Sequence, residues 1–171
     1  MKRLAVIGTR NPTGNQKLLA RELVELALKH GWSISTGGAE GIDQVAMETC
    51  EKQEKIGRLT VYLPWRSFNQ GIIPSGCEKV YYCGQKDWIK SLELHPFPEG
   101  LSQGAAKLHA RNYGIIESAD MVAAFPGENP GGTAQGMRIA EYLGKRMYVY
   151  HEDRYDLCPL VKKRLAGKKP V

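Results

Sequence analysis

No apolar run in this chain of 171 residues approaches the roughly 20 residues that cross a lipid bilayer. After Met1-Lys2-Arg3, only five apolar or small residues precede Thr9 and Arg10, which is too short for the core of a signal peptide. The sequence therefore predicts a cytoplasmic protein with no membrane partner.

Cysteines are few, and their spacing does not match a metal site. Four are present, at positions 50, 77, 83 and 158, with no C-x-x-C pair and no histidine pattern nearby. Free cysteines in a reducing compartment are the favoured interpretation, and zinc binding or a disulfide remains the alternative. We therefore predict no metal site and no cofactor.

Two common nucleotide-binding signatures are missing. Gly8 is followed by no second glycine until Gly14, so the first loop is not a dinucleotide fingerprint, and no Gly-Lys-Ser/Thr of a Walker A loop occurs. The composition is otherwise that of a globular protein, with 42% hydrophobic and 25% charged residues. This length and composition fit one domain with a sizeable core.

Short apolar runs alternate along the chain with amphipathic segments. Strands are predicted at residues 4–8, 32–36, 59–63, 79–83, 120–125 and 146–150, and helices at 18–30, 42–56, 102–118 and 133–143. Residues 64–77 and 84–100 have no clear pattern. Strands and helices that alternate at this spacing indicate an α/β fold with a parallel sheet.

Three loops carry residues suited to an anionic ligand. They span residues 8–13, 36–41 and 126–133, and each follows a predicted strand. Right-handed crossovers bring the carboxyl ends of parallel strands to one edge, so the loops should converge there. A helix N-terminus receives phosphate, and glycine allows it to approach the backbone. Close packing of a helix on a strand also requires glycine, so packing remains the alternative for each loop.

Several charged side chains near these loops have two interpretations each. Arg10 either pairs with a phosphate or is a surface arginine. Asp43 either contacts the ligand or stabilises the first turn of its helix. Arg111 either neutralises ligand charge or forms a surface ion pair. His109, on the same predicted helix, is a less favoured candidate for a general base.

Other features are compatible with nucleic acid. Trp65 and Phe68, together with Arg66, either stack on a base or cover the edge of the core. The formal net charge is +6, and much of it lies in a basic C-terminal tail, residues 156–171. A solvated chain end is the favoured interpretation of this tail, with a contact to DNA as the alternative.

The loop sequences resemble a known superfamily. Residues 6–13 (VIGTRNPT) and 35–43 (STGGAEGID) resemble the "GSR-x-P-T" and "SGGARGID" stretches of DprA (Smf). Residues 131–145 resemble the third motif of the wider SLOG superfamily, which joins DprA, the YpsA-like proteins and the Lonely Guy phosphoribohydrolases. The similarity covers most of residues 4–150. It implies a three-layer Rossmann-like fold, with a doubly wound, mainly parallel sheet in a single domain, residues 1–155, and self-association into a homo-oligomer.

The resemblance also implies a function at the strand-end edge, where relatives bind nucleotides, nucleotide-derived ligands or single-stranded DNA. Two positions differ from the relatives. Glu40 stands where DprA-like proteins carry a basic residue, and Gly136 stands where the Lonely Guy enzymes have a glutamate that is needed for hydrolysis. The arginine that those enzymes carry on the preceding helix corresponds to Arg111.

Three functions remain open. The first is binding of a nucleotide or a nucleotide-derived small molecule. The second is hydrolysis of the N-glycosidic bond of a nucleoside 5′-monophosphate, with Glu40 and Arg111 as candidate catalytic residues and Asp43 or Glu128 as alternative carboxylates. The third is single-stranded DNA binding. The candidate ligand-binding residues are Gly8, Thr9, Arg10, Thr36, Gly37, Gly38, Ala39, Asp43, Pro126, Gly131, Gly132 and Thr133.

One geometric expectation is common to these functions. The turns at Gly37-Gly38 and Gly131-Gly132 are expected to share one anion across the top of the sheet. Gly38→Val and Gly132→Val should then abolish ligand binding and leave the fold mostly intact, because only the added side chain intrudes.

Overall fold

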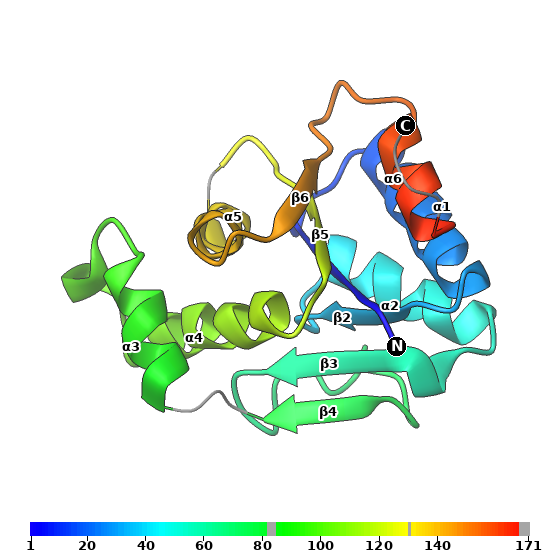
Figure 1. The fold of residues 1–171 in the computed structure, drawn as a ribbon. Coiled ribbons are helices and arrows are strands. Elements are labelled where there is room, and N and C mark those ends of the chain that lie inside the picture. Colours follow the sequence, from blue (N-terminus) through cyan, green and yellow to red (C-terminus); the bar gives the residue numbers. More distant parts are fainter. Residues whose placement is uncertain (82–84, 130, 168–171) are drawn as a thin grey trace.

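A parallel β-sheet forms the centre of the molecule (Figure 1). The computed structural model describes residues 1–81, 85–129 and 131–167. In this part of the chain, six strands pair in the order β4-β3-β2-β1-β5-β6, and every pairing is parallel. The strands are β1 (Arg3–Gly8), β2 (Ser33–Thr36), β3 (Leu59–Leu63), β4 (Glu78–Tyr81), β5 (Met121–Phe125) and β6 (Arg146–Val149).

Helices cover both faces of the sheet. The α-helices are α1 (Gly14–Lys29), α2 (Ile42–Lys52), α3 (Gln85–Glu93), α4 (Gln103–Glu117), α5 (Gly131–Tyr142) and α6 (Pro159–Leu165), and the short 3-10 helices are η1 (Ile56–Arg58) and η2 (Pro98–Gly100). Figure 1 shows α1, α2 and α6 on one side of the sheet and α3, α4 and α5 on the other. The predicted three-layer, doubly wound Rossmann-like fold is therefore confirmed. No helix in the described ranges is long and apolar enough to span a bilayer.

The core is divided in two by the sheet. Successive side chains of a strand point to opposite faces, so Leu4 and Val6 pack with α1 and α2, whereas Ala5 and Ile7 pack with α4 and α5. All four are buried. Both faces of the sheet are thus covered, which explains why the strands read as continuous apolar runs rather than as alternating patterns.

The order of the strands reverses between β1 and β5. The chain proceeds outward from β1 through β2 and β3 to β4, and then returns to β5 on the other side of β1. The loops that follow β1 and β5 consequently diverge at the carboxyl edge of the sheet. In open α/β sheets, such a switch point is the usual position of a ligand site.

Every predicted strand and helix has a counterpart in the structure, and the structure differs from the prediction in several regions. The predicted helix 42–56 ends at Lys52, because Glu54 adopts a positive φ of 54° and a 3-10 turn follows. Helix α3 lies within residues 84–100, for which no element was predicted. The fourth strand is described from Glu78 to Tyr81, and the rest of its predicted range, including Cys83, lies outside the described residues.

Helix α6 lies within the segment predicted as a basic tail. Val161 and Leu165 are fully buried in the core that α1 and α2 share. The indole Nε1 of Trp32 donates a hydrogen bond to the carbonyl oxygen of Leu165 at 3.1 Å. Val161 and Leu165 are one helical turn apart and therefore lie on the same face of α6. In the sequence, the lysines and arginine between them conceal this apolar face.

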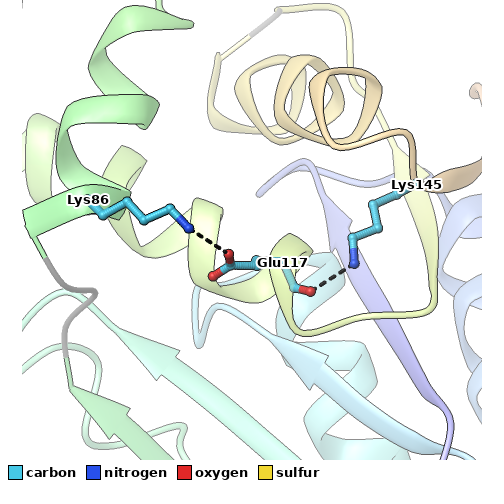
Figure 2. A network of polar contacts seen from close by, with 3 residues as sticks. All are labelled: Lys86, Glu117 and Lys145. Atoms are coloured by element: carbon cyan, nitrogen blue, oxygen red, sulfur yellow. Dashed lines mark hydrogen bonds and ion pairs between the residues drawn. The ribbon is translucent and has the colours of Figure 1, made fainter.

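Two lysines meet the C-terminal end of α4 (Figure 2). Nζ of Lys145 donates to the carbonyl oxygens of Glu117 and Ala119, at 2.8 and 2.7 Å. From α3, Nζ of Lys86 lies 3.7 Å from the Glu117 carboxylate. The last carbonyls of a helix have no partners within it, so a cation at this position satisfies them and favours the helix dipole.

Candidate functional site

A cavity of about 360 Å³ lies at the switch point. Its walls come from the loops after β1, β2 and β5, from the start of α5 and from one face of α4. The lining residues are Ile7, Gly8, Thr9, Arg10, Ala39, Asp43, Ala105, Leu108, His109, Arg111, Asn112, Ile115, Asn129, Gly131, Gly132 and Thr133. This volume is within the range of small-molecule sites.

Thr9 joins the three loops at the cavity floor. Its backbone N–H donates to the carbonyl oxygen of Phe125 at 2.9 Å, and its own carbonyl oxygen accepts from the N–H of Ile42 at 3.2 Å. Its Oγ1 accepts from the N–H of Asn11 at 3.2 Å. The next residue, Arg10, is exposed and lines the cavity, so its guanidinium is available to solvent and to a ligand.

Gln16 ties the first loop to the loop after β5. Thr13 and Gln16 form a capping box at the start of α1. The buried amide of Gln16 also donates to the carbonyl oxygens of Pro126 and Tyr150, at 2.8 and 3.1 Å. Pro126 therefore helps to hold the loop in place, and it does not line the cavity.

The turn after β2 is built around a carboxylate of the chain itself. Oδ2 of Asp43 accepts a hydrogen bond from the backbone N–H of Ala39 at 3.2 Å. Gly37 and Gly38 are buried and are not among the lining residues. A carboxyl group does approach the backbone of this glycine turn, but it belongs to Asp43. The expected anion shared between this turn and Gly131-Gly132 is therefore not supported by the geometry.

The two glycines of this turn are needed for packing. A Cβ on Gly37 would lie 2.7 Å from Cζ of Arg111 and 2.8 Å from Oδ2 of Asp43. A Cβ on Gly38 would lie 2.8 Å from Leu63, and Gly38 also has a φ of +70°. The expectation that Gly38→Val leaves the fold intact is consequently wrong, because the new side chain would enter the core.

Arg111 is a buried charge below the cavity rather than a surface arginine. Only 7% of the residue is exposed. Its guanidinium lies over the ring of Phe68, 5.4 Å from the centroid, and Nη1 donates weakly to the carbonyl oxygen of Tyr62 at 3.5 Å. Burial raises the pKa of Asp43, and the charge of Arg111 together with the N–H of Ala39 opposes that rise.

Helix α5 begins at the opposite wall. Gly131 has a φ of +41°, and Gly131 and Gly132 are exposed, whereas Thr133 is buried. The amide Nδ2 of Asn112 donates to the carbonyl oxygen of Gly132 at 3.2 Å and joins α4 to this turn. A Cβ on Gly132 would meet nothing closer than 3.8 Å, so the backbone here is open to the cavity.

His109 adds an uncharged ring to the α4 wall. Its ring centroid lies 4.7 Å from that of His95. Burial, with the charges of His95, Arg138 and Arg111, lowers the pKa of His109 to about 4. The ring is therefore neutral near pH 7 and accepts a proton only at acid pH.

The predicted site residues thus separate into two groups. The cavity brings together Gly8, Thr9, Arg10, Ala39, Asp43, Arg111, Gly131, Gly132 and Thr133. Thr36, Gly37, Gly38, Glu40 and Pro126 do not line it. Thr36 instead donates from Oγ1 to the carbonyl oxygen of Val6 at 2.9 Å, and Glu40 is exposed. Among the described residues, Asp43 is the one carboxylate that lines the cavity.

The sequence did not identify most of the α4 wall. Ala105, Leu108 and Asn112 line the cavity, and only Arg111 had been selected as a ligand residue from this helix. The signal was the spacing of three and four residues along a predicted helix, which places side chains on one face. The same spacing is found in a helix face that packs in a core. It therefore indicates a ligand-binding face only once the structure shows a cavity beside the helix.

Trp65 and Phe68 take different positions after β3. Their rings meet edge to face with centroids 5.3 Å apart. Phe68 packs beneath Arg111, as in the core-edge interpretation, whereas Trp65 is 37% exposed. The three cysteines within the described residues, Cys50, Cys77 and Cys158, are free.

Comparison with known structures identifies the fold. DNA processing protein A from Helicobacter pylori, whose structure concerns single-stranded DNA binding, has a TM-score of 0.58 and 24% identity. The match covers 86% of this chain and 64% of that one, so the chain spans less than two thirds of that relative. The molybdenum cofactor binding protein from Rippkaea orientalis has a TM-score of 0.61 and 21% identity, over 96% of this chain and 81% of that one.

A third structure agrees with these two. The molybdenum cofactor carrier protein from Chlamydomonas reinhardtii has a TM-score of 0.60 and 21% identity, over 86% of this chain and 75% of that one. At these identities the likeness shows the fold alone, a Rossmann-like α/β fold with a parallel sheet. A comparison with curated proteins finds no match.

The sequence itself matches a family. The model of the family described as DNA recombination-mediator protein A matches residues 1–158. The match includes all three glycine-containing loops and every residue that lines the cavity. The chain therefore belongs to the DNA recombination-mediator protein A family.

Proposed function

We propose that this protein binds a phosphorylated, nucleotide-derived small molecule in the cavity at the switch point. The observation that supports this most is the convergence of two arginines and a helix N-terminus on one cavity. Arg10, Arg111 and the turn Gly131–Thr133 all line it. These groups favour one kind of ligand, an anion with several acceptor oxygens.

The phosphate is expected at the start of α5. The first N–H groups of a helix have no partners within it, and the positive end of the helix dipole adds to their attraction. Gly131 and Gly132 leave that backbone uncovered, and Thr133 brings a hydroxyl to the same turn. Arg10, which is exposed on the facing loop, would close over the phosphate.

Arg111 has a different part in this proposal. Asp43 lies close to its guanidinium, which also lies over the ring of Phe68. A buried pair of this kind costs desolvation energy, which good contacts only partly offset. We expect Arg111 to contribute a fixed positive field beneath the ligand, and Asp43 to hold that guanidinium in place.

Binding of small molecules tests the proposal directly. Titration of the full chain with inorganic phosphate, ribose 5-phosphate and the common nucleoside monophosphates, followed by calorimetry, should give saturable binding of at least one. Arg10→Ala should weaken it about tenfold, which corresponds to the loss of one charged hydrogen bond of about 1.4 kcal/mol. Arg21→Ala, an exposed arginine of α1 outside the cavity, is the matched control. The absence of binding by all of these compounds would refute the proposal.

Single-stranded DNA binding is a second candidate, and family membership favours it. Trp65 is partly exposed and Arg66 lies over the ring of Tyr81, 5.6 Å from its centroid. Exposed rings beside arginines are what stacking of unpaired bases requires. Oligonucleotide affinity should then fall steeply with salt and drop with Trp65→Ala. Affinity that is unchanged in that variant would exclude Trp65 as the contact.

A further inference from the structure

The solvent-facing side of α1 contains an exposed leucine in line with several charged residues. Leu18 is 61% exposed, whereas Leu19, Leu23 and Leu28 of the same helix are buried. Spacings of three and four residues place further side chains on the same side of the helix as Leu18. We call this side the α1 face; its residues are Leu18, Arg21, Glu22, Glu25, Leu26 and Lys29. None of them lines the cavity at the switch point.

A groove of about 590 Å³ lies beside the second half of the α1 face. Its walls come from α1, from the end of α2 and the segment before η1, and from α6, which Figure 1 shows next to α1. The lining residues are Glu22, Glu25, Leu26, Leu28, Lys29, Gln53, Lys55 and Lys162. Leu26 and Leu28 give the groove an apolar part. One face of the molecule therefore offers both a projecting leucine and a recess that suits an apolar side chain.

The charges of the α1 face differ between its two halves. Arg21 lies in the first half, near Leu18, and Glu25 lies in the second half, at the groove. Within the described residues neither of them forms an ion pair, and Glu25 accepts a hydrogen bond from Nε2 of Gln53 at 3.3 Å. Both charges are therefore available to a group of opposite charge outside this chain.

Antiparallel packing of two α1 faces brings these features into register. Leu18 and Leu26 are separated by about 12 Å along the axis, at 1.5 Å per residue, and Glu22 lies midway. A twofold axis beside Glu22 therefore places Leu18 of each copy at the groove of the other. It also places Arg21 of each copy near Glu25 of the other, where opposite charges attract. The two Glu22 side chains meet at the axis, each already paired with a lysine of α6 at 3.4 Å.

We infer that the α1 face is the interface of a twofold-symmetric homodimer, in which Leu18 of each copy enters the groove of the other. A twofold interface requires a surface that complements itself. The α1 face meets this requirement in shape, through the projecting leucine and the groove, and in charge, through Arg21 and Glu25. The inference involves no residue of the cavity, so it is tested independently of the ligand proposed above.

Sedimentation equilibrium of the full chain over a wide range of concentration tests the dimer. The wild type should approach twice the mass of one chain. Leu18→Glu should weaken dimerisation at least about tenfold, because it places a carboxylate in the apolar part of the groove. Leu160→Glu is the matched control, because Leu160 is 53% exposed on α6 and lies outside the α1 face; it should change the affinity less than about twofold. A wild type that stays monomeric, or a dimer that Leu18→Glu leaves intact, would overturn the inference.

Reversal of the two charges tests the antiparallel register. Arg21→Glu and Glu25→Arg should each weaken dimerisation about fivefold or more, because each places like charges opposite one another. The combined variant exchanges the two charges and should restore the wild-type affinity to within about twofold. All three substitutions lie at solvent-accessible positions, and circular dichroism checks that the fold is retained. A combined variant that dimerises no more tightly than either single variant would overturn the inference.

Cross-linking locates the twofold axis. A residue beside the axis meets its own copy, so Glu22→Cys should give a disulfide-linked dimer when the protein is oxidised with diamide and run on a non-reducing gel. The wild type, which contains four native cysteines, provides the background, and Leu160→Cys should not exceed it. If Leu160→Cys forms the linked dimer as readily as Glu22→Cys, the axis does not lie at the α1 face and the inference is wrong.

Discussion

At the scale of single residues, Asp43 explains the glycine turn after β2. Its carboxylate takes the N–H of Ala39, and Gly37 leaves room for the guanidinium of Arg111 beside it. The turn therefore serves the internal electrostatics of the protein. The turn before α5 has the opposite character, because Gly132 faces open space. The two similar glycine pairs thus have different physical functions.

This difference predicts opposite effects of the same substitution. Gly38→Val should destabilise the fold by about 3 kcal/mol or more, because its Cβ would lie within 2.9 Å of Leu63 and Val61 at a φ of +70°. Gly132→Val should change the free energy of unfolding by less than about 1 kcal/mol and still abolish phosphate binding. Chemical denaturation and calorimetry measure the two quantities. Equal stabilities of the two variants would contradict the assignment.

His109 predicts a dependence of stability on pH. Its pKa falls from 6.5 to about 4 on folding, so the unfolded chain binds the proton more readily between these values. Its contribution to stability is therefore complete above pH 6.5 and is lost as the pH falls towards 4. Because the side chain is partly exposed, we expect a loss of roughly 1–2 kcal/mol. Denaturation at a series of pH values should show this slope, and His109→Gln should flatten it. If stability depends on pH as steeply in His109→Gln as in the wild type, other titratable groups cause that dependence.

At the scale of elements, α4 is the helix on which the site depends. It carries Arg111 beneath the cavity, and Asn112 connects it to the start of α5. Its N-terminus is capped by Ser102, whose Oγ accepts from the N–H of Ala105 at 3.2 Å. Its C-terminus is capped by Lys145, which comes from the turn before β6 (Figure 2). The wall of the cavity is thus held at both ends.

The two lysines at the end of α4 should contribute unequally. Lys145→Met removes two hydrogen bonds to backbone carbonyls and should cost about 1–2 kcal/mol. Lys86→Met removes an exposed ion pair at 3.7 Å and should cost less than about 0.5 kcal/mol, and this cost should shrink further as added salt screens the pair. Urea denaturation compares the two variants with the wild type. A larger loss of unfolding free energy in Lys86→Met than in Lys145→Met would contradict this ranking.

At the scale of the whole molecule, α6 completes the layer that covers one face of the sheet. Leu157, Val161 and Leu165 enter the core formed by α1 and α2. Helix α6 follows the last strand, so this part of the core closes only when the chain beyond β6 has folded back. The domain is therefore held together by residues far apart in sequence.

The packing of α6 predicts that a C-terminal substitution affects the whole fold. Leu165→Ala should lower the free energy of unfolding by about 2–4 kcal/mol, because it opens a cavity in a fully buried position. Lys163→Ala, on the exposed face of the same helix, should have an effect below about 0.5 kcal/mol. Thermal unfolding followed by circular dichroism would detect both. A Leu165→Ala variant as stable as the wild type would show that α6 is dispensable for the core.

The alternation of apolar runs and amphipathic segments determined the layered parallel fold. The position of the site at the strand-end edge followed, because chain connectivity and handedness leave little choice once the strands are parallel. Local sequence also marked Arg10 and the Gly131–Thr133 turn, since a loop after a strand and a helix start are local features. The fold class and the turn at the start of α5, where we propose that a phosphate binds, could therefore be predicted from the sequence.

Only the tertiary structure decided how the two glycine turns differ, because Asp43 and Arg111 are far apart in the chain and meet by packing. It also decided that α6 is part of the core, since lysines surround its two buried positions and hide the apolar face. The α4 wall became visible for the same reason: a face of a helix becomes a ligand surface only when the elements opposite it leave a space. Patterns along a chain describe what each segment can bury, and the assembled fold determines what it actually meets.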